Sequence, residues 1–250
     1  MDKQKELFGL FAELKLKAFG DHYKRAIGKN KNEVEAVLLE LCLLEVDRRF
    51  DAKVKNRIKQ ATFPKIKTMA MLDYELVPRL PRDRVEELAT CEFIRQNRNV
   101  ILVGDSGGGK THLAIALGIE ACKKNLSVKF YGASTLVNQL LREYRRGEIE
   151  KFMARIRKHD AVIKDEMGYV PFSKKGAELL FTVCSDRYEA GSLIITSNLN
   201  FSKWTEVFGD KTMTTALLDR LVHKATIIKY DWGSVRFNQA MEEHGKIELS

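Results

Sequence analysis

The chain has 250 residues, of which 44% are hydrophobic and 31% charged, with a formal net charge of +9 and an isoelectric point of about 9.3. This much apolar sequence excludes a wholly disordered chain, and no apolar run approaches the ~18 residues of a membrane span. The basic balance favours a polyanionic partner, with nucleic acid as the first candidate. Four scattered cysteines without a C-x-x-C pair, and a charged N-terminus without an apolar signal region, predict a reducing cytoplasm.

The first part of the chain carries helical patterns. Residues 7–26 have apolar side chains near helical spacing, and Asn32 with Glu35 resembles a capping box that opens a clearer helix. One face of this second helix is apolar, and we expect it to pack against other helices as core. That face consists of Val34, Val37, Leu38, Leu41 and Leu44.

The segment from Arg48 to Lys67 is strongly basic. It contains eight basic residues and one acid, Asp51, whereas a solvated helix face normally mixes both signs. A solvated face is the alternative, but the shortage of acids favours contact with a DNA or RNA backbone. The residues proposed for this contact are Arg48, Arg49, Lys53, Lys55, Arg57 and Lys59.

The stretch from Val100 to Gly118 gives the strongest signal. A short apolar run at residues 100–103 predicts a buried strand, which is followed by G-x-x-x-x-G-K-[ST] and then by the small-residue pattern of a close-packed helix. Glycines let backbone N–H groups curl around phosphate oxygens, Lys110 can reach the β- and γ-phosphates, and the Thr111 hydroxyl can ligate Mg²⁺. The phosphate loop consists of Gly104, Asp105, Ser106, Gly107, Gly108, Gly109, Lys110 and Thr111.

A second basic run follows at residues 141–159, with seven basic residues against three glutamates. It is a further candidate for a nucleic-acid surface, and a solvated helical hairpin explains it equally well. Arg145 and Arg146 are the residues that we propose for contact with nucleic acid in this run.

Two later strand patterns end in polar residues. Residues 161–166 end in two acids, of which Asp165 would hold Mg²⁺ through water and Glu166 would act as general base toward the attacking water. Lys164 is unusual, because such a strand is normally apolar throughout. Residues 193–198 form the next pattern, where Asn198 could orient the same water, although asparagine is also common where strands end.

The order of these features resembles an AAA+ ATPase of the helicase-loader clade, and more narrowly an IstB-type transposition helper, over nearly the whole chain. Beside the phosphate loop, the marks of the resemblance are Asp165–Pro171, Arg187–Glu189, Thr196–Leu199 and Leu218–Leu221. The departures are Gly107-Gly108, Lys164 and Val235, and none of them removes a catalytic group.

The resemblance implies an α/β fold: a doubly wound parallel AAA+ sheet with the phosphate-loop strand central, and an N-terminal all-α helical domain. Residues 1–68 would form the helical domain, 69–82 a linker and 83–250 the ATPase domain. The implied cofactors are ATP and Mg²⁺. Asn198 would be sensor I, Arg236 a sensor II arginine acting in cis, and Arg220 an arginine finger given to a neighbour's ATP.

The implied function is that of a DNA-dependent ATPase, which self-associates on duplex DNA and assists a partner transposase in target selection and insertion, without a membrane. The main alternative is a replicative helicase loader that binds single-stranded DNA and a hexameric helicase. The basic segment at 48–67 and the loop at 167–171 favour the transposition helper. A small-molecule P-loop kinase has no need of Asn198 or an arginine finger, and a nucleotide-bound scaffold has no need of Glu166.

Overall fold

The computed structural model describes residues 3–26, 31–168, 171–235, 237 and 241. Its contacts divide the chain into two compact units, Met1–Asn56 and Arg57–Ser250. Within the described part of the chain, no helix combines the length and the apolar character needed to cross a bilayer. The assignment of a helical domain, a linker and an ATPase domain to residues 1–68, 69–82 and 83–250 stays a prediction.

The first unit is helical. Helices α1 (Lys3–Glu13) and α2 (Lys17–Ala26) are separated by Lys15, whose φ of +55° is left-handed, so the pattern at residues 7–26 forms two helices. The long helix α3 (Lys31–Ala61) packs on them and continues into the second unit from Arg57 onward. The buried core of the first unit consists of Leu7, Phe11, Leu14, Tyr23 and Cys42.

The predicted apolar face of α3 is only partly buried, so the expectation that all of it forms core was wrong. Leu38 packs against the core of the first unit, together with Leu39, Cys42 and Val46. The helical rotation of 100° per residue places the other members of the face on a different side of α3. Those members are Val34, Val37, Leu41 and Leu44, exposed by 36%, 55%, 57% and 59%.

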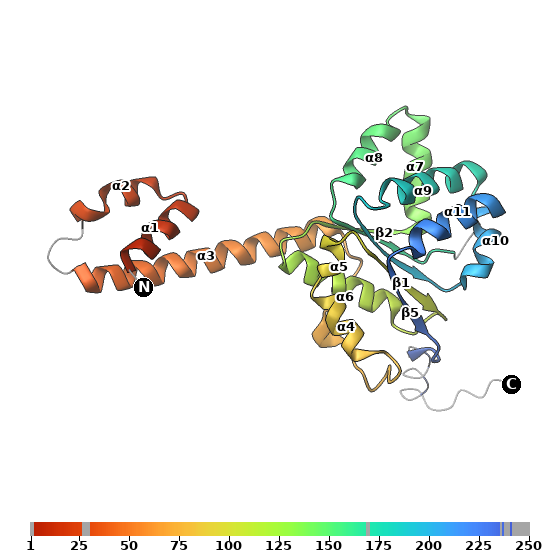
Figure 1. Cartoon of the computed structure of the whole chain (residues 1–250), viewed down its shortest axis with the longest axis horizontal. Helices are drawn as coiled ribbons and strands as arrows, with labels where there is room; N and C mark the ends of the chain where they lie inside the picture. Colours follow the sequence, from red (N-terminus) through yellow and green to blue (C-terminus); the bar gives the residue numbers. More distant parts are fainter. Residues whose placement is uncertain (1–2, 27–30, 169–170, 236, 238–240, 242–250) are drawn as a thin grey trace. The chain divides into compact units, whose positions relative to one another are not determined.

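The second unit is built on a five-stranded parallel sheet (Figure 1). Its strands stand in the order β2-β3-β4-β1-β5, and every neighbouring pair is parallel. Strand β1 therefore lies inside the sheet, between β4 and β5, and all five carboxyl ends meet at one edge. The strands are β1 (Asn99–Gly104), β2 (Val128–Gly132), β3 (Ala161–Asp165), β4 (Ser192–Ser197) and β5 (Ala225–Tyr230).

Helices cover both faces of this sheet, which confirms the doubly wound α/β prediction. One core contains side chains of α4 (Arg82–Ala89), α5 (Glu92–Arg95) and α6 (Lys110–Lys123). The other contains side chains of α7 (Ala133–Arg145), α8 (Ile149–Arg157), α9 (Lys174–Asp186), α10 (Trp204–Phe208) and α11 (Lys211–Val222). Along β1, Val100 and Leu102 join the first core and Ile101 and Val103 the second, which explains the unbroken apolar run. Single turns of 3-10 helix, η1 (Met69–Met71) and η2 (Phe201–Lys203), complete the elements.

Lys164, the unusual residue of β3, is fully buried. Its Nζ lies 2.9 Å from Cys184 Sγ of α9. Burial lowers the pKa of Lys164 from its usual value, against the smaller, opposing effect of Cys184. Arg187 is buried as well and donates to the backbone carbonyls of Ile156, Asp160 and Ser192.

We predict that Lys164→Met raises the free energy of unfolding by ~1–3 kcal/mol at about pH 7, because it removes a buried amine whose one polar contact within the described residues is Cys184 Sγ. Since the pKa of Lys164 is lowered by folding, the unfolded chain binds more protons between that lowered pKa and 10.5. The difference in the free energy of unfolding between Lys164→Met and the wild-type chain should therefore shrink as the pH rises through this window. Urea unfolding at about pH 7 and about pH 9 measures this, with exposed Lys158→Met as control. A difference in unfolding free energy that is the same at both pH values would contradict the lowered pKa of Lys164 as its cause.

Candidate functional site

The phosphate loop connects the end of β1 to the start of α6. Gly107 and Gly109 have φ values of +85° and +99°, in the left-handed region that favours glycine. Gly104 is constrained by its neighbour, because an added Cβ would lie 2.0 Å from the carbonyl oxygen of Tyr230. The glycines of the motif are therefore required by the backbone at these positions.

Lys110 lies inside the loop. Its Nζ donates to the carbonyl oxygens of Gly104, at 2.7 Å, and of Asp105, at 2.6 Å. These bonds hold an ammonium group beside the loop backbone, where phosphate oxygens would need a counter-charge. The side chains of Asp105 and Ser106 are exposed, so the Asp105 carboxylate is not buried in the loop.

Asp165 ends β3 and accepts hydrogen bonds from two neighbouring elements. Thr111 Oγ1 of α6 donates to Asp165 Oδ1 at 2.8 Å, and Thr196 Oγ1 of β4 donates to the same oxygen at 2.6 Å. The next residue, Glu166, has a left-handed φ of +59°, and its backbone N–H donates to Thr196 Oγ1 at 2.9 Å. The cluster thus fixes the Asp165 carboxylate beside the loop, while Glu166 itself is exposed.

Asn198 directly follows β4, next to this cluster. Its Oδ1 is buried and has no hydrogen-bond partner within the described part of the chain. A buried acceptor left without a partner costs about 1–3 kcal/mol, so this atom is suited to receive a donor from a bound ligand or water.

These groups fit a nucleoside triphosphate with Mg²⁺. The loop offers backbone amides and the Lys110 cation, and Thr111 and Asp165 offer one hydroxyl and one carboxylate. Mg²⁺ usually takes only one or two carboxylates from a protein and keeps several waters. The described residues hold no cluster of three or more His, Cys, Asp or Glu side chains placed for a metal.

Arg220, which was predicted to act in trans, is not brought to this cluster. It lies in the last turn of α11, where its Nη1 donates to Ala216 O at 2.8 Å. Its guanidinium carbon lies 5.5 Å from the ring centroid of Phe181. Arg236 lies outside the described residues, so its predicted role stays a prediction.

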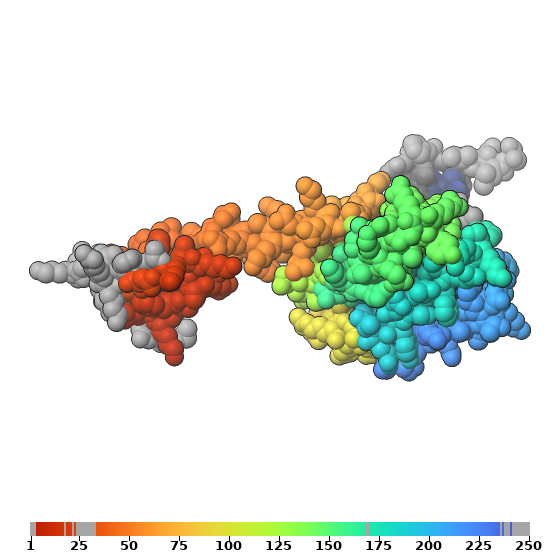
Figure 2. Space-filling view, turned by 90° about the horizontal axis from the view of Figure 1, so that it is seen from above, coloured from red at the N-terminus to blue at the C-terminus, as the bar shows by residue number. Residues whose placement is uncertain are grey.

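The residues predicted to contact DNA differ in their availability. Arg48 and Arg49 pair with Glu45 at 2.6 and 2.7 Å and lower the pKa of that carboxyl to about 2. Arg57 donates to Asn125 Oδ1 at 3.0 Å. The remaining candidates are exposed, with no hydrogen-bond or ion-pair partner among the described residues. They are Lys53, Lys55 and Lys59 of α3, and Arg145 and Arg146 at the end of α7, whose surface is green in Figure 2.

Two contributors were missed from the sequence. Thr196 bridges Asp165 and Glu166, and the signal for it was a pair of hydroxyl residues, Thr196 and Ser197, between the apolar part of the strand and Asn198. The chain after β5 also contacts the loop, since Trp232 Nε1 donates to Gly108 O at 3.2 Å. No local pattern predicts that second contact.

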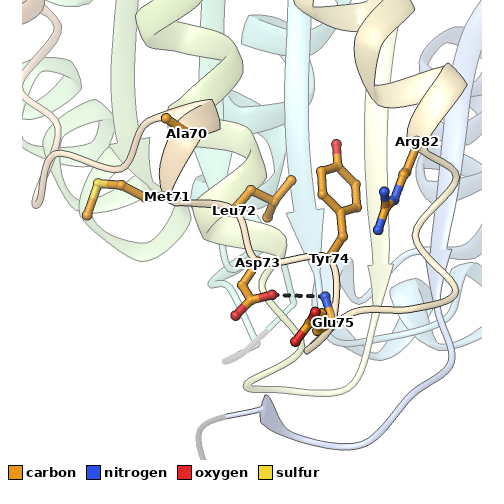
Figure 3. Close-up of a pocket in the computed structure, with 7 residues that line it drawn as sticks. All are labelled: Ala70, Met71, Leu72, Asp73, Tyr74, Glu75 and Arg82. Atoms are coloured by element: carbon orange, nitrogen blue, oxygen red, sulfur yellow. Dashed lines mark hydrogen bonds between the residues drawn. The ribbon is translucent and has the colours of Figure 1, made fainter.

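A surface pocket of about 460 Å³ lies in the segment before α4 (Figure 3). The Arg82 guanidinium lies over the Tyr74 ring at 4.5 Å, and the Asp73 carboxylate accepts a hydrogen bond from the Glu75 backbone at 2.9 Å. None of these side chains contacts the cluster around Asp165, so we assign the pocket no part in hydrolysis. Its lining is Ala70, Met71, Leu72, Asp73, Tyr74, Glu75 and Arg82.

Comparison with known proteins agrees with this site. A family model described as IstB-like ATP binding protein matches residues 11–243. The chain belongs to this family. A relative from Pseudomonas aeruginosa, described as an ATP-binding protein of insertion sequence IS21, is 35% identical over 94% of this chain and 89% of its own length. One from Geobacillus stearothermophilus, described likewise for insertion sequence IS5376, is 37% identical over 81% of this chain and 79% of its own.

Solved structures share the fold. DnaA from Aquifex aeolicus bound to AMPPCP superposes with a TM-score of 0.58 at 19% identity, over 75% of this chain and 57% of that one. DnaI superposes with a TM-score of 0.52 at 18% identity, over 72% and 99%. The predicted AAA+ P-loop fold and family are therefore confirmed, and the IstB-like chain is an ATP-binding ATPase.

We predict that Thr196→Val, which removes the hydroxyl but keeps the shape, lowers kcat for ATP hydrolysis about 10–100-fold. The reason is that Asp165 and the Glu166 backbone lose their common partner. The Kd for ATP should stay within about twofold, because the phosphate loop is unchanged. Steady-state hydrolysis and calorimetric titration measure both, with exposed Thr182→Val as control. A wild-type kcat in the Thr196 variant would contradict the proposed bridge.

Proposed function

We propose that this chain is the ATPase of an insertion sequence, which assembles on duplex DNA with ATP and assists a partner transposase in target selection and insertion. The observation that carries the proposal is the family match over residues 11–243, together with relatives described as insertion-sequence ATP-binding proteins. The four cysteines, Cys42, Cys91, Cys122 and Cys184, are buried and free, which supports a reducing cytoplasm as its location.

Different residues of the chain have separate roles in ATP hydrolysis. The loop amides and Lys110 would hold the β- and γ-phosphates, and Thr111 and, through water, Asp165 would hold Mg²⁺, which would neutralise phosphate charge. The Glu166 carboxylate accepts a proton from the attacking water, which the Asn198 side chain orients. The exposure of Glu166 and the unpartnered Asn198 Oδ1 support these two roles.

A second copy of the chain supplies the remaining cation. Arg220 donates to Ala216 O of its own helix, and no bond to Asp165 or Glu166 is found within the described part of the chain, which supports a role at a neighbour's site. In comparable phosphoryl-transfer systems an arginine finger is worth ~10³–10⁵ in rate. Hydrolysis would then depend on assembly, with Arg236 acting in cis as sensor II.

In this proposal, basic side chains that have no partner within the described residues contact the phosphates of duplex DNA. Each lysine that neutralises a phosphate releases a counterion, which makes binding tight at low salt and insensitive to sequence. Lys53, Lys55 and Lys59 have no partner among the residues that the structure describes, whereas Arg48 and Arg49 pair with Glu45. A replicative helicase loader that binds single strands is the alternative, and the family match favours the transposition ATPase.

Sedimentation of Glu166→Gln with ATP tests this proposal, because that variant should bind ATP and remain in the ATP state. We expect large particles on duplex DNA. Replacing Lys53, Lys55 and Lys59 by glutamine should weaken DNA binding and reduce the salt slope by about 3. The charge-matched control replaces Lys123, Lys175 and Lys224, which pair with glutamates, and should leave binding unchanged.

Two outcomes would contradict the proposal. Particles that form only on single-stranded DNA would indicate the helicase loader. A monomer under all conditions would remove self-association and with it the role of Arg220.

A further inference from the structure

The chain that follows β5 runs beside the phosphate loop. Strand β5 pairs with β1 up to Gly104 opposite Tyr230, so both strands end at the same level of the sheet. The phosphate loop begins at Gly104, and residues 231–235 follow Tyr230. We call residues 230–235 the strap.

The strap holds two consecutive carbonyl groups of the loop. Trp232 Nε1 donates to Gly108 O at 3.2 Å, and the Val235 backbone N–H donates to Gly107 O at 3.2 Å. In a planar trans peptide the C=O and the following N–H point in opposite directions. Fixing the carbonyls of Gly107 and Gly108 toward the strap therefore turns the N–H groups of Gly108 and Gly109 away from it.

The strap and the loop are also fitted to each other in shape. The rings of Tyr230 and Trp232 lie 4.6 Å apart, and a Cβ added to Gly108 would lie 3.4 Å from the Tyr230 ring. A Cβ added to Gly107 would lie 2.0 Å from Ser234 Oγ. This close approach gives a physical reason for the glycine at position 107, one of the departures from the family pattern.

We propose that Trp232 is a positioning residue for ATP binding, which holds the peptide planes of the loop with their amides toward the phosphates before ATP arrives. The inference rests on ATP binding by the loop and requires neither DNA nor a second subunit. Loss of the indole N–H frees the Gly108 peptide to rotate, so part of the binding energy is then spent on ordering the loop.

Trp232→Phe tests the inference, since phenylalanine keeps an aromatic ring beside Tyr230 and removes only the donor. Titration of the full chain with ATP and Mg²⁺, without DNA, should show a Kd that is about three- to tenfold weaker. With DNA and saturating ATP, kcat should stay within about twofold, because the bond acts before chemistry. The control is Trp204→Phe, which removes the other indole, a donor to Leu199 O in the opposite core, and should not change the Kd.

A second pair of variants keeps the inference testable if Trp232→Phe does not fold. Gly107→Ala should weaken ATP binding, because its methyl group meets Ser234 and because the φ of +85° is unfavourable for alanine. Adding Ser234→Gly removes the first of these two causes and should restore part of the binding, at least about threefold.

These binding measurements test the role of the strap separately from ATP binding by the chain. Wild-type affinity in Trp232→Phe, an equal loss in Trp204→Phe, or no rescue by Ser234→Gly would overturn the role of the strap. Failure of the wild-type chain itself to bind ATP would instead contradict the proposed function.

Discussion

The site depends on one carboxylate that is shared by two hydroxyl donors. Asp165 Oδ1 accepts from Thr111 at the start of α6 and from Thr196 in β4, so it ties the phosphate loop to two strand ends. The arrangement follows from the parallel sheet, whose carboxyl ends meet at one edge, with β1 inside it beside β4. Chemistry that needs a phosphate cradle, a metal ligand and a base within a few ångströms can be assembled at such an edge without further scaffolding.

Local patterns predicted the parts of this site that are contiguous in the chain. The apolar run before Gly104, the glycine loop and the acids after β3 each carry their signal within a few residues, and the sheet places them together as expected. Thr196 and Trp232 could not be predicted in the same way, because their roles depend on partners 31 and 124 residues away. The exposed side of α3 was misjudged for a related reason: periodicity identifies an apolar face but not which side of it a neighbouring helix covers.

The number of charged residues in a segment likewise does not show which cations are paired in the folded chain. The basic segment of α3 is uniform in sequence, but in the structure Glu45 pairs with Arg48 and Arg49, while Lys53 and Lys55 have no partner in the described ranges. Surface ion pairs contribute little to stability, but a paired carboxylate offsets part of the charge that a cation offers to a polyanion. We therefore expect the unpaired lysines to contribute more to DNA contact than Arg48 and Arg49 do. Arg220 was expected to act at a neighbour's ATP, and its hydrogen bond to Ala216 O keeps it within its own helix in this chain.

We propose that a second copy of the chain completes the ATP site, and hydrolysis by a mixture of two inactive variants measures this. Arg220→Ala has an intact site and no finger, and Glu166→Gln has an intact finger and an inactive site, so each alone should bind ATP without hydrolysing it on duplex DNA. Mixed in equal amounts, they should recover up to about one quarter of wild-type hydrolysis, since that share of interfaces joins an intact site to an intact finger. Wild-type hydrolysis by Arg220→Ala alone, or no recovery in mixed particles that form normally, would contradict the account.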